Sequence, residues 1–317
     1  MSRFKSALAL SGGSARALSH LGVIQGIERR NLKFDLIVGT SMGAVIGGLY
    51  ACFGDSARVI ERLKNLFESE LFLKTASIAV DEDFVFAGPG SFINRFMWLF
   101  RQGVFYTRTM LKMELVADDL YDELLSMLIP EVLIEDLPVP FAAVAMDLRT
   151  GEEIVLTKGS LRRAIAASSS IPGMFPAIRI NGRMLVDGGW ADNVPAVPAI
   201  VLGAHFVLAV DATLDIAGIA TYPKSAMGIL LRCDEITRIL LTRHRKSAAD
   251  VLIVPETGDI FWADFKSFDH CLAAGRKVFE ENASTVYKQM LLRRFRTLKG
   301  AIHPGRTGEW EHPLVIV

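Results

Sequence analysis

The chain has 317 residues, of which 51% are hydrophobic and 22% charged, a composition typical of folded globular proteins and unlike that of disordered chains. Its formal net charge is zero, which argues against a nucleic-acid partner because nucleic-acid-binding proteins usually carry a basic excess. The three cysteines (Cys52, Cys233 and Cys271) are isolated and lack C-x-x-C spacing, which argues against a disulfide framework or a cysteine-based metal site.

The apolar patterns predict no export signal and no membrane span. The apolar segment 7–10, which follows the basic N-terminal residues, is too short for the core of a signal peptide. Two longer uncharged runs, 36–54 and 193–210, are interrupted by glycines or prolines. These runs therefore indicate buried strand–turn–helix or helix–turn–strand units, and the chain is expected to be a soluble cytoplasmic protein.

The first part of the chain alternates predicted strands and helices. A strand over residues 6–10 leads into a glycine-rich turn, and apolar residues then recur at helical spacing to about residue 30. A second strand over 34–38 precedes a small-residue helix at 44–51 and another helix near 56–67. This alternation predicts a mostly parallel sheet covered by helices.

Residues 68–129 break that alternation. The segment is rich in phenylalanine, contains glycine and proline breakers, and closes with a predicted helix from about 109 to 128. We interpret it as an insertion lying over the sheet. It could be an ordinary core layer, or a lid or acyl-chain wall with exposed apolar surface.

The sheet resumes after this insertion. Strands at 141–146 and 154–157 flank a turn at 149–152, which predicts a hairpin. A short strand ends at Asp187. Further buried strands are predicted at 206–210 and 251–254, and further helices near 225–245 and 266–296.

Ser41 has the neighbours that a nucleophilic serine needs. It lies in Gly39-Thr40-Ser41-Met42-Gly43, between an apolar run and a small-residue helix. Gly-x-Ser-x-Gly in such a context forms a nucleophile elbow, a sharp turn in which side chains two positions away would clash. The pattern is only moderately specific, so its value depends on a base and an oxyanion hole elsewhere in the chain.

A serine requires a base to accept its proton, and the residues offer two alternatives. None of the six histidines follows a strand in a glycine-flanked loop with an obvious acid partner, and His20 is interpreted as structural. Asp187 ends a predicted strand and precedes Gly188 and Gly189, which allow a tight turn and a close approach. A partly desolvated carboxylate can serve directly as a base, so we favour Asp187, although a Ser-His-Asp triad stays open.

Gly12, Gly13 and Ser14 follow the first predicted strand and precede a helix. Backbone N–H groups in such a turn can stabilise the oxyanion that acyl transfer generates. A phosphate-binding loop is the competing interpretation, but neither the G-x-G-x-x-G nor the G-x-x-x-x-G-K-[ST] pattern is present.

Together these motifs resemble the patatin-like phospholipase family, in particular its compact bacterial members. The glycine-rich turn, the Ser41 elbow and Asp187-Gly188-Gly189 occur in the family's order, with 167–173 before the aspartate and 193–195 after it. The resemblance covers about residues 5–290. It implies a three-layer α/β/α fold with a mostly parallel central sheet and an acyl hydrolase that acts on lipid esters without metal or cofactor.

The resemblance also assigns roles to individual residues. Ser41 would be the nucleophile and Asp187 the base, with the oxyanion hole formed by Gly12, Gly13 and the N–H of Ser14. The family's turn has glycines where this chain has Ser14 and Ala17. Both residues keep a backbone N–H, but a positive φ at Ser14 would cost on the order of 1 kcal/mol and could tilt the hole.

Two further features are expected to support the site. Arg16 is expected either to hold the turn by donating to carbonyl groups, which we favour, or to meet a lipid phosphate. The serine-rich turn 168–172 is expected to pack near Asp187 without a catalytic part.

The C-terminal segment 288–306 is basic and interleaved with apolar residues. Such segments are attracted to anionic lipid surfaces, so peripheral membrane contact is one expectation, and a solvated helix end is the other. We assign residues 1–295 to one acyl hydrolase domain and 296–317 to a basic tail.

The main hypothesis is a serine acyl hydrolase of the phospholipase A or lipase-esterase type. An acyltransferase or thioesterase using the same two residues is the first alternative. The second is a non-catalytic lipid-binding protein whose altered turn has disabled the oxyanion hole.

Overall fold

The computed structural model describes residues 4–79, 116–213, 222–223, 226–298 and 314–317. The strands in these ranges are β1 (Ser6–Leu10), β2 (Leu36–Thr40), β3 (Phe141–Asp147), β4 (Glu153–Leu156), β5 (Ile178–Ile180), β6 (Arg183–Asp187), β7 (Phe206–Val210), β8 (Val251–Ile253) and β9 (Leu314–Ile316). The α-helices are α1 (Ser19–Arg29), α2 (Met42–Phe53), α3 (Ser56–Glu68), α4 (Glu70–Ala79), α7 (Asp118–Leu128), α8 (Leu161–Ser169), α9 (Ala196–Val201), α10 (Ala226–Arg245) and α11 (Phe268–Leu298).

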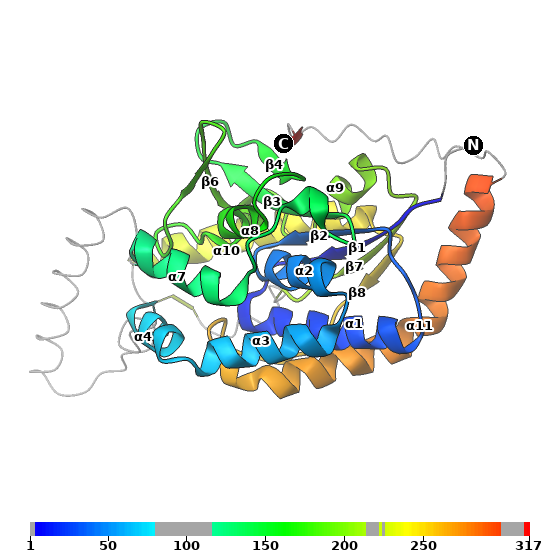
Figure 1. Ribbon diagram of the computed structural model, residues 1–317, viewed down its shortest axis with the longest axis horizontal. Helices are drawn as coiled ribbons and strands as arrows, with labels where there is room; N and C mark the ends of the chain where they lie inside the picture. The colour runs from blue at the N-terminus through cyan, green and yellow to red at the C-terminus, as the bar shows by residue number, and fades with distance from the viewer. Residues whose placement is uncertain (1–3, 80–115, 214–221, 224–225, 299–313) are drawn as a thin grey trace, which may run out of the picture.

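The strands form one mixed, mostly parallel sheet with helices on both faces (Figure 1). Its order is β5-β6-β3-β2-β1-β7-β8, with β4 on β3 and β9 on β4. The five-strand part β3-β2-β1-β7-β8 is parallel throughout, and β4, β5 and β6 add antiparallel pairs. The predicted three-layer α/β/α architecture is confirmed.

Alternate side chains of β1 face the two helical layers. Leu8 and Leu10 belong to the larger core cluster, which also includes the buried faces of α1, α2, α3 and α11. Ala7 and Ala9 belong to a smaller cluster with residues of α9. Because side chains of a strand alternate between faces, this spacing places both helical layers against the same central strand.

Several boundaries differ from the sequence-based expectation. β2 begins at Leu36 and extends to Thr40, so the strand reaches the residue before Ser41. Residues 314–316, predicted as tail, pair with β4, and α11 continues past residue 295. Of the helix predicted from about 109 to 128, the described part is α7, which begins at Asp118. The aromatic part of the insertion, within 80–115, lies outside the described residues.

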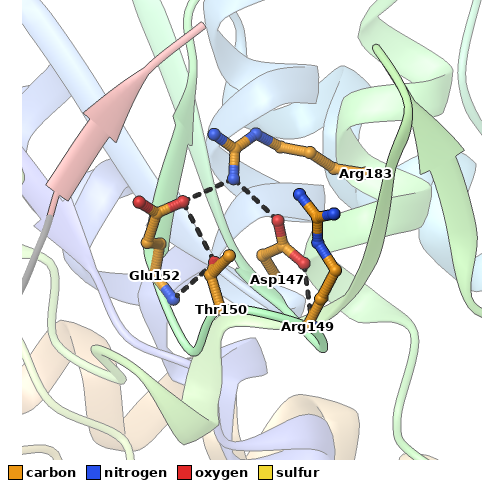
Figure 2. A network of polar contacts seen from close by, with 5 residues as sticks. All are labelled: Asp147, Arg149, Thr150, Glu152 and Arg183. Atoms are coloured by element: carbon orange, nitrogen blue, oxygen red, sulfur yellow. Dashed lines mark hydrogen bonds and ion pairs between the residues drawn. The ribbon is translucent and has the colours of Figure 1, made fainter.

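An ion-pair network holds the predicted hairpin between β3 and β4 against β6 (Figure 2). Arg183 Nη1 lies 2.7 Å from Asp147 Oδ2 and also pairs with Glu152. Asp147 is buried, and its carboxylate also accepts the N–H of Arg149 at 2.9 Å. Burial alone would raise the pKa of Asp147, but these hydrogen bonds outweigh it and lower that pKa. The network fixes the start of β6, whose last residue is Asp187.

Candidate active site

Ser41 occupies the turn between β2 and α2. Its φ is 55° and its ψ is −126°, a strained conformation for a residue with a side chain, which persists only where the surroundings hold it. The Ser41 N–H donates to Ser168 Oγ at 2.9 Å, and its carbonyl accepts the N–H of Ala44 at 2.8 Å. The strand–turn–helix context that the motif predicts is therefore present.

The two glycines of the elbow are required by close backbone contacts. A Cβ on Gly43 would lie 2.3 Å from the Leu10 carbonyl oxygen, and a Cβ on Gly39 would lie 2.4 Å from the Gly43 carbonyl oxygen. Real Cβ atoms do not approach backbone so closely, so any larger residue would push α2 away from β1 and β2.

β3 brings Asp187 to the serine. Its first half pairs with β2, as Thr40 opposes Val144, and its second half pairs with β6, as Asp187 opposes Ala145. β4 pairs with both halves, so it occupies one edge of β3 and leaves β2 and β6 end to end on the other. Asp187 and Thr40, the residue before Ser41, therefore pair with adjacent residues of β3.

Asp187 is buried beside the serine. It is 3% exposed, its Oδ1 accepts the Gly189 N–H at 2.7 Å, and its carboxylate is hydrogen-bonded by the Ser41 side chain. Burial raises the pKa of Asp187 to about 6, against these two hydrogen bonds and the positive charge of Arg238, which lower it. The group is therefore ionised at neutral pH and a stronger base than an exposed aspartate.

The glycine-rich turn lies next to Ser41, since a Cβ on Gly12 would be 3.2 Å from Ser41 Cβ. The Gly12 N–H donates to the Asn193 carbonyl at 3.1 Å. Gly13 has a φ of 148° and Ser14 a φ of 51°, so the positive φ considered for Ser14 is adopted. Within the described part of the chain, the N–H groups of Gly13 and Ser14 have no hydrogen-bond acceptor. Of the three N–H groups predicted to form an oxyanion hole, that of Gly12 is thus occupied by the Asn193 carbonyl.

The sequence matches a family model. A model for patatin-like phospholipases covers residues 8–200, well over half of the chain. The chain belongs to the patatin-like phospholipase family. The predicted resemblance is thus confirmed.

Patatin-like relatives extend this comparison. The chain is 32% identical over 213 residues to lysophospholipase NTE1 of Mycosarcoma maydis, covering 64% of this chain and 9% of that protein. It is 33% identical over 204 residues to an uncharacterized NTE family protein of Mycobacterium bovis, covering 64% and 48%. The mouse (Mus musculus) patatin-like phospholipase domain-containing protein 6 is 29% identical over 257 residues, covering 80% and 16%. The chain therefore spans less than half the length of each of these relatives.

Among solved structures, the patatin-like chain is similar to VipD from Legionella pneumophila. The TM-score is 0.44 at 13% identity, and the superposition covers 90% of this chain and 67% of VipD. In the part of the patatin-like chain that the structure describes, no group of three or more His, Cys, Asp and Glu side chains could hold a metal ion.

Arg16 and His20 support the turn of this patatin-like domain. Arg16 donates through Nε to the Ala212 carbonyl at 3.3 Å and through Nη1 to the Ile260 carbonyl at 2.9 Å, the carbonyl-binding arrangement that we favoured. His20 Nε2 lies 2.8 Å from the Ser11 carbonyl, and burial lowers the pKa of His20 to about 4. The neutral His20 ring therefore supports the turn and has the structural role that we predicted.

Sequence reasoning missed the part that Ser168 plays in this patatin-like site. As expected, residues 168–172 pack near Asp187, whose N–H donates to the Ser170 carbonyl at 2.9 Å. Not foreseen was that Ser168 Oγ accepts the N–H of Ser41. The end of α8 therefore holds the backbones of both Ser41 and Asp187. Its signal in the sequence was its position within the family's motif order.

A second group of residues, buried around Arg245, could not be identified from the sequence. Arg245, at the end of α10, pairs with Asp192 at 2.9 Å and with Glu153, and all three side chains are at most 3% exposed. Asp192 lies in the loop after Asp187, where its carbonyl accepts the Thr40 hydroxyl at 2.8 Å. This Arg245 cluster (Glu153, Asp192 and Arg245) thus anchors the loop that follows Asp187 through residues far apart in sequence.

Proposed function

We propose that this protein is a serine acyl hydrolase that cleaves lipid esters with Ser41 and Asp187. The observation that supports the proposal most directly is the hydrogen bond of the Ser41 side chain to a buried Asp187 whose pKa is raised to about 6. A nucleophile in hydrogen-bond contact with a base of suitable pKa is the minimal requirement of this chemistry.

In the proposed mechanism Asp187 accepts the hydroxyl proton as Ser41 Oγ attacks the ester carbonyl. The oxyanion of the tetrahedral intermediate accepts hydrogen bonds from the N–H groups of Gly13 and Ser14, which have no other acceptor among the described residues. Asp187 then returns the proton to the leaving alcohol. Water repeats the cycle on the acyl-enzyme, with Asp187 again as base.

We propose lysophospholipids or phospholipids as the substrate class. This rests on the membership of the patatin-like phospholipase family and on the similarity to a protein named as a lysophospholipase. A fluorescent phosphonate that labels active serines should label the wild-type protein and not the Ser41→Ala variant. Ser247→Ala, which removes an exposed serine from the short 3₁₀ helix after α10, should label as the wild type does. An unlabelled wild-type protein that releases no fatty acid would refute the proposal.

The same reaction with an acceptor other than water would make the enzyme a transferase. Product analysis separates the two cases, since hydrolysis releases free fatty acid whereas transfer acylates an added alcohol or thiol. If the release of free fatty acid falls as the acylated acceptor accumulates, the transferase alternative replaces the hydrolase proposal.

Peripheral membrane contact through residues 288–306 is a separate part of the proposal. In the described part of this segment, Leu291, Leu292 and Phe295 are exposed among basic residues. α11 runs parallel to α1, so this end lies roughly 30 Å along the helix from Phe268, away from the glycine-rich turn. Contact there would tether the protein without placing its active site on the bilayer.

We expect sedimentation with anionic liposomes to fall when the exposed Lys288, Arg294 and Arg296 are replaced by glutamine, since each basic residue near such a surface contributes about 1 kcal/mol. Hydrolysis of a soluble short-chain ester should persist in the same variant. Equal sedimentation of both proteins would exclude this contact. None of the described helices is both long enough and apolar enough to cross a membrane.

A further inference from the structure

Trp190 links the catalytic loop to α10. It follows Asp187-Gly188-Gly189 directly, and its indole Nε1 donates to Asp234 Oδ1 at 3.1 Å. Asp234 Oδ2 accepts Arg238 Nε at 3.0 Å, and the Arg238 guanidinium carbon lies 4.4 Å from the centre of the Trp190 ring. We call these three residues the Trp190 cluster. The mechanism above uses none of them.

The Arg238 guanidinium is held in place, but not all of its nitrogens donate to an acceptor among the described residues. Its Nε is engaged by Asp234 and its face by Trp190, which fixes the plane of the group. Within the described ranges of the chain, Nη1 and Nη2 have no hydrogen-bond acceptor. The side chain is 33% exposed, so these nitrogens remain accessible to a ligand from solvent.

This cation acts on the reaction centre. Burial raises the pKa of Asp187, and the positive charge of Arg238 is among the influences that lower it. Asp187 is in turn hydrogen-bonded by Ser41. Because the guanidinium stacks on Trp190, three residues after Asp187, it lies beside the segment that carries the proposed base.

We propose that Arg238 binds the phosphate of the lipid head group, with Trp190 and Asp234 orienting its guanidinium. A guanidinium presents two parallel N–H donors to a phosphate, and the geometry is favourable when its plane is already fixed. The inference rests on the proposed function and extends it: phosphodiester-bearing lipids are preferred over neutral glycerides. It makes Arg238 a specificity residue of the site.

The test compares monomeric lysophosphatidylcholine with a monoacylglycerol of the same acyl chain, at a pH well above the pKa of Asp187. Arg238→Gln should lower kcat/KM for the phospholipid by about tenfold, mainly through KM, which corresponds to the loss of one charged hydrogen-bonding contact. The monoacylglycerol should change less than about twofold by the same reasoning. Arg243→Gln is the matched control, because Arg243 is exposed and lies on a different side of α10.

Arg238→Lys separates binding from an electrostatic effect on the base. It keeps the charge, so the acidic limb of the pH–rate profile should stay in place, while loss of the planar fork should still raise KM for the phospholipid. An equal loss for both substrates in Arg238→Gln, together with an acidic limb moved to higher pH, would mean that Arg238 acts only through Asp187. That result, or no change in either variant, would overturn the inference.

A binding measurement tests Arg238 independently of turnover. In the Ser41→Ala background, the Kd of monomeric lysophosphatidylcholine should rise about tenfold on Arg238→Gln. Glycerophosphocholine should compete for the site better than inorganic phosphate at the same concentration. The reverse order would indicate a free-phosphate site and contradict the head-group assignment. Loss of hydrolysis in all proteins with intact, Arg238-dependent binding would instead refute the proposed function alone.

Discussion

Asp187→Asn is expected to lower kcat/KM for ester hydrolysis by about 10²–10⁴-fold, the usual contribution of a positioned general base. Asparagine keeps the size of the side chain and can still meet the Ser41 hydroxyl, but it cannot accept the proton. The wild-type rate should also fall below a pH of about 6, because burial raises the pKa of Asp187 to about 6 and the protonated carboxyl is inactive. A wild-type rate that stayed constant through that range would contradict the assignment of Asp187 as base.

The same substitution should stabilise the fold. A group whose folded-state pKa is raised from 3.8 to about 6 destabilises the folded state when ionised, by about 3 kcal/mol at neutral pH as an upper estimate. This cost falls as pH falls through 6 and disappears below 3.8, where Asp187 is protonated in both states. Urea unfolding of Asp187→Asn should therefore show a higher free energy of unfolding than wild type at neutral pH and little difference near pH 4.

Asp147→Asn is the matched control with the opposite sign. Hydrogen bonds from Arg149 and Arg183 lower the pKa of Asp147, so its ionised form stabilises the folded state at neutral pH, and that stability is lost as pH falls through the folded pKa. The control should therefore be less stable than wild type at neutral pH. A destabilised Asp187→Asn variant would show that hydrogen bonding to the carboxylate outweighs its burial.

Arg245→Met is expected to reduce the free energy of unfolding by about 3–5 kcal/mol, the cost of leaving buried charge uncompensated. Glu153 and Asp192 are each 1% exposed, and burial raises the pKa of both carboxyl groups. Without the guanidinium they must remain as unpaired charges or take up protons. The deficit should therefore shrink as pH falls, because protonation removes the buried charge.

Two variants make this second result specific. Arg294→Met, at an exposed position of α11, should change stability by less than about 0.5 kcal/mol. The triple variant Glu153→Gln, Asp192→Asn, Arg245→Met removes the whole cluster's charge and should recover much of the loss. If Arg245→Met unfolds like wild type, the cluster does not hold the loop that follows Asp187.

The local features of the site could be predicted from sequence. Gly39 and Gly43 flag a sharp turn at Ser41 because only glycine fits those close contacts, and the strand ending at Asp187 is visible from its apolar run. The positive φ at Ser14 follows from its place in a glycine-rich turn. Each of these inferences depends on neighbours within a few residues.

The long-range features could not be predicted in this way. Periodicity does not reveal that β2 and β6 share one edge of β3, because register is set by pairing between distant segments. Glu153 and Arg245 are charged residues that sequence alone would place at the surface, yet they are buried together. The strand β9 was absorbed into a predicted tail because three residues are too few for a periodic signal.

The end-to-end placement of β2 and β6 also constrains the order in which the protein can become active. The elbow is made from adjacent elements early in the chain, whereas its partner arrives only after β3 has formed and β6 has folded back along it. Contacts between segments so distant in sequence form slowly, because the intervening chain must first be ordered. During synthesis Ser41 therefore emerges long before Asp187, and the proposed catalytic pair can form only after β6 has joined β3.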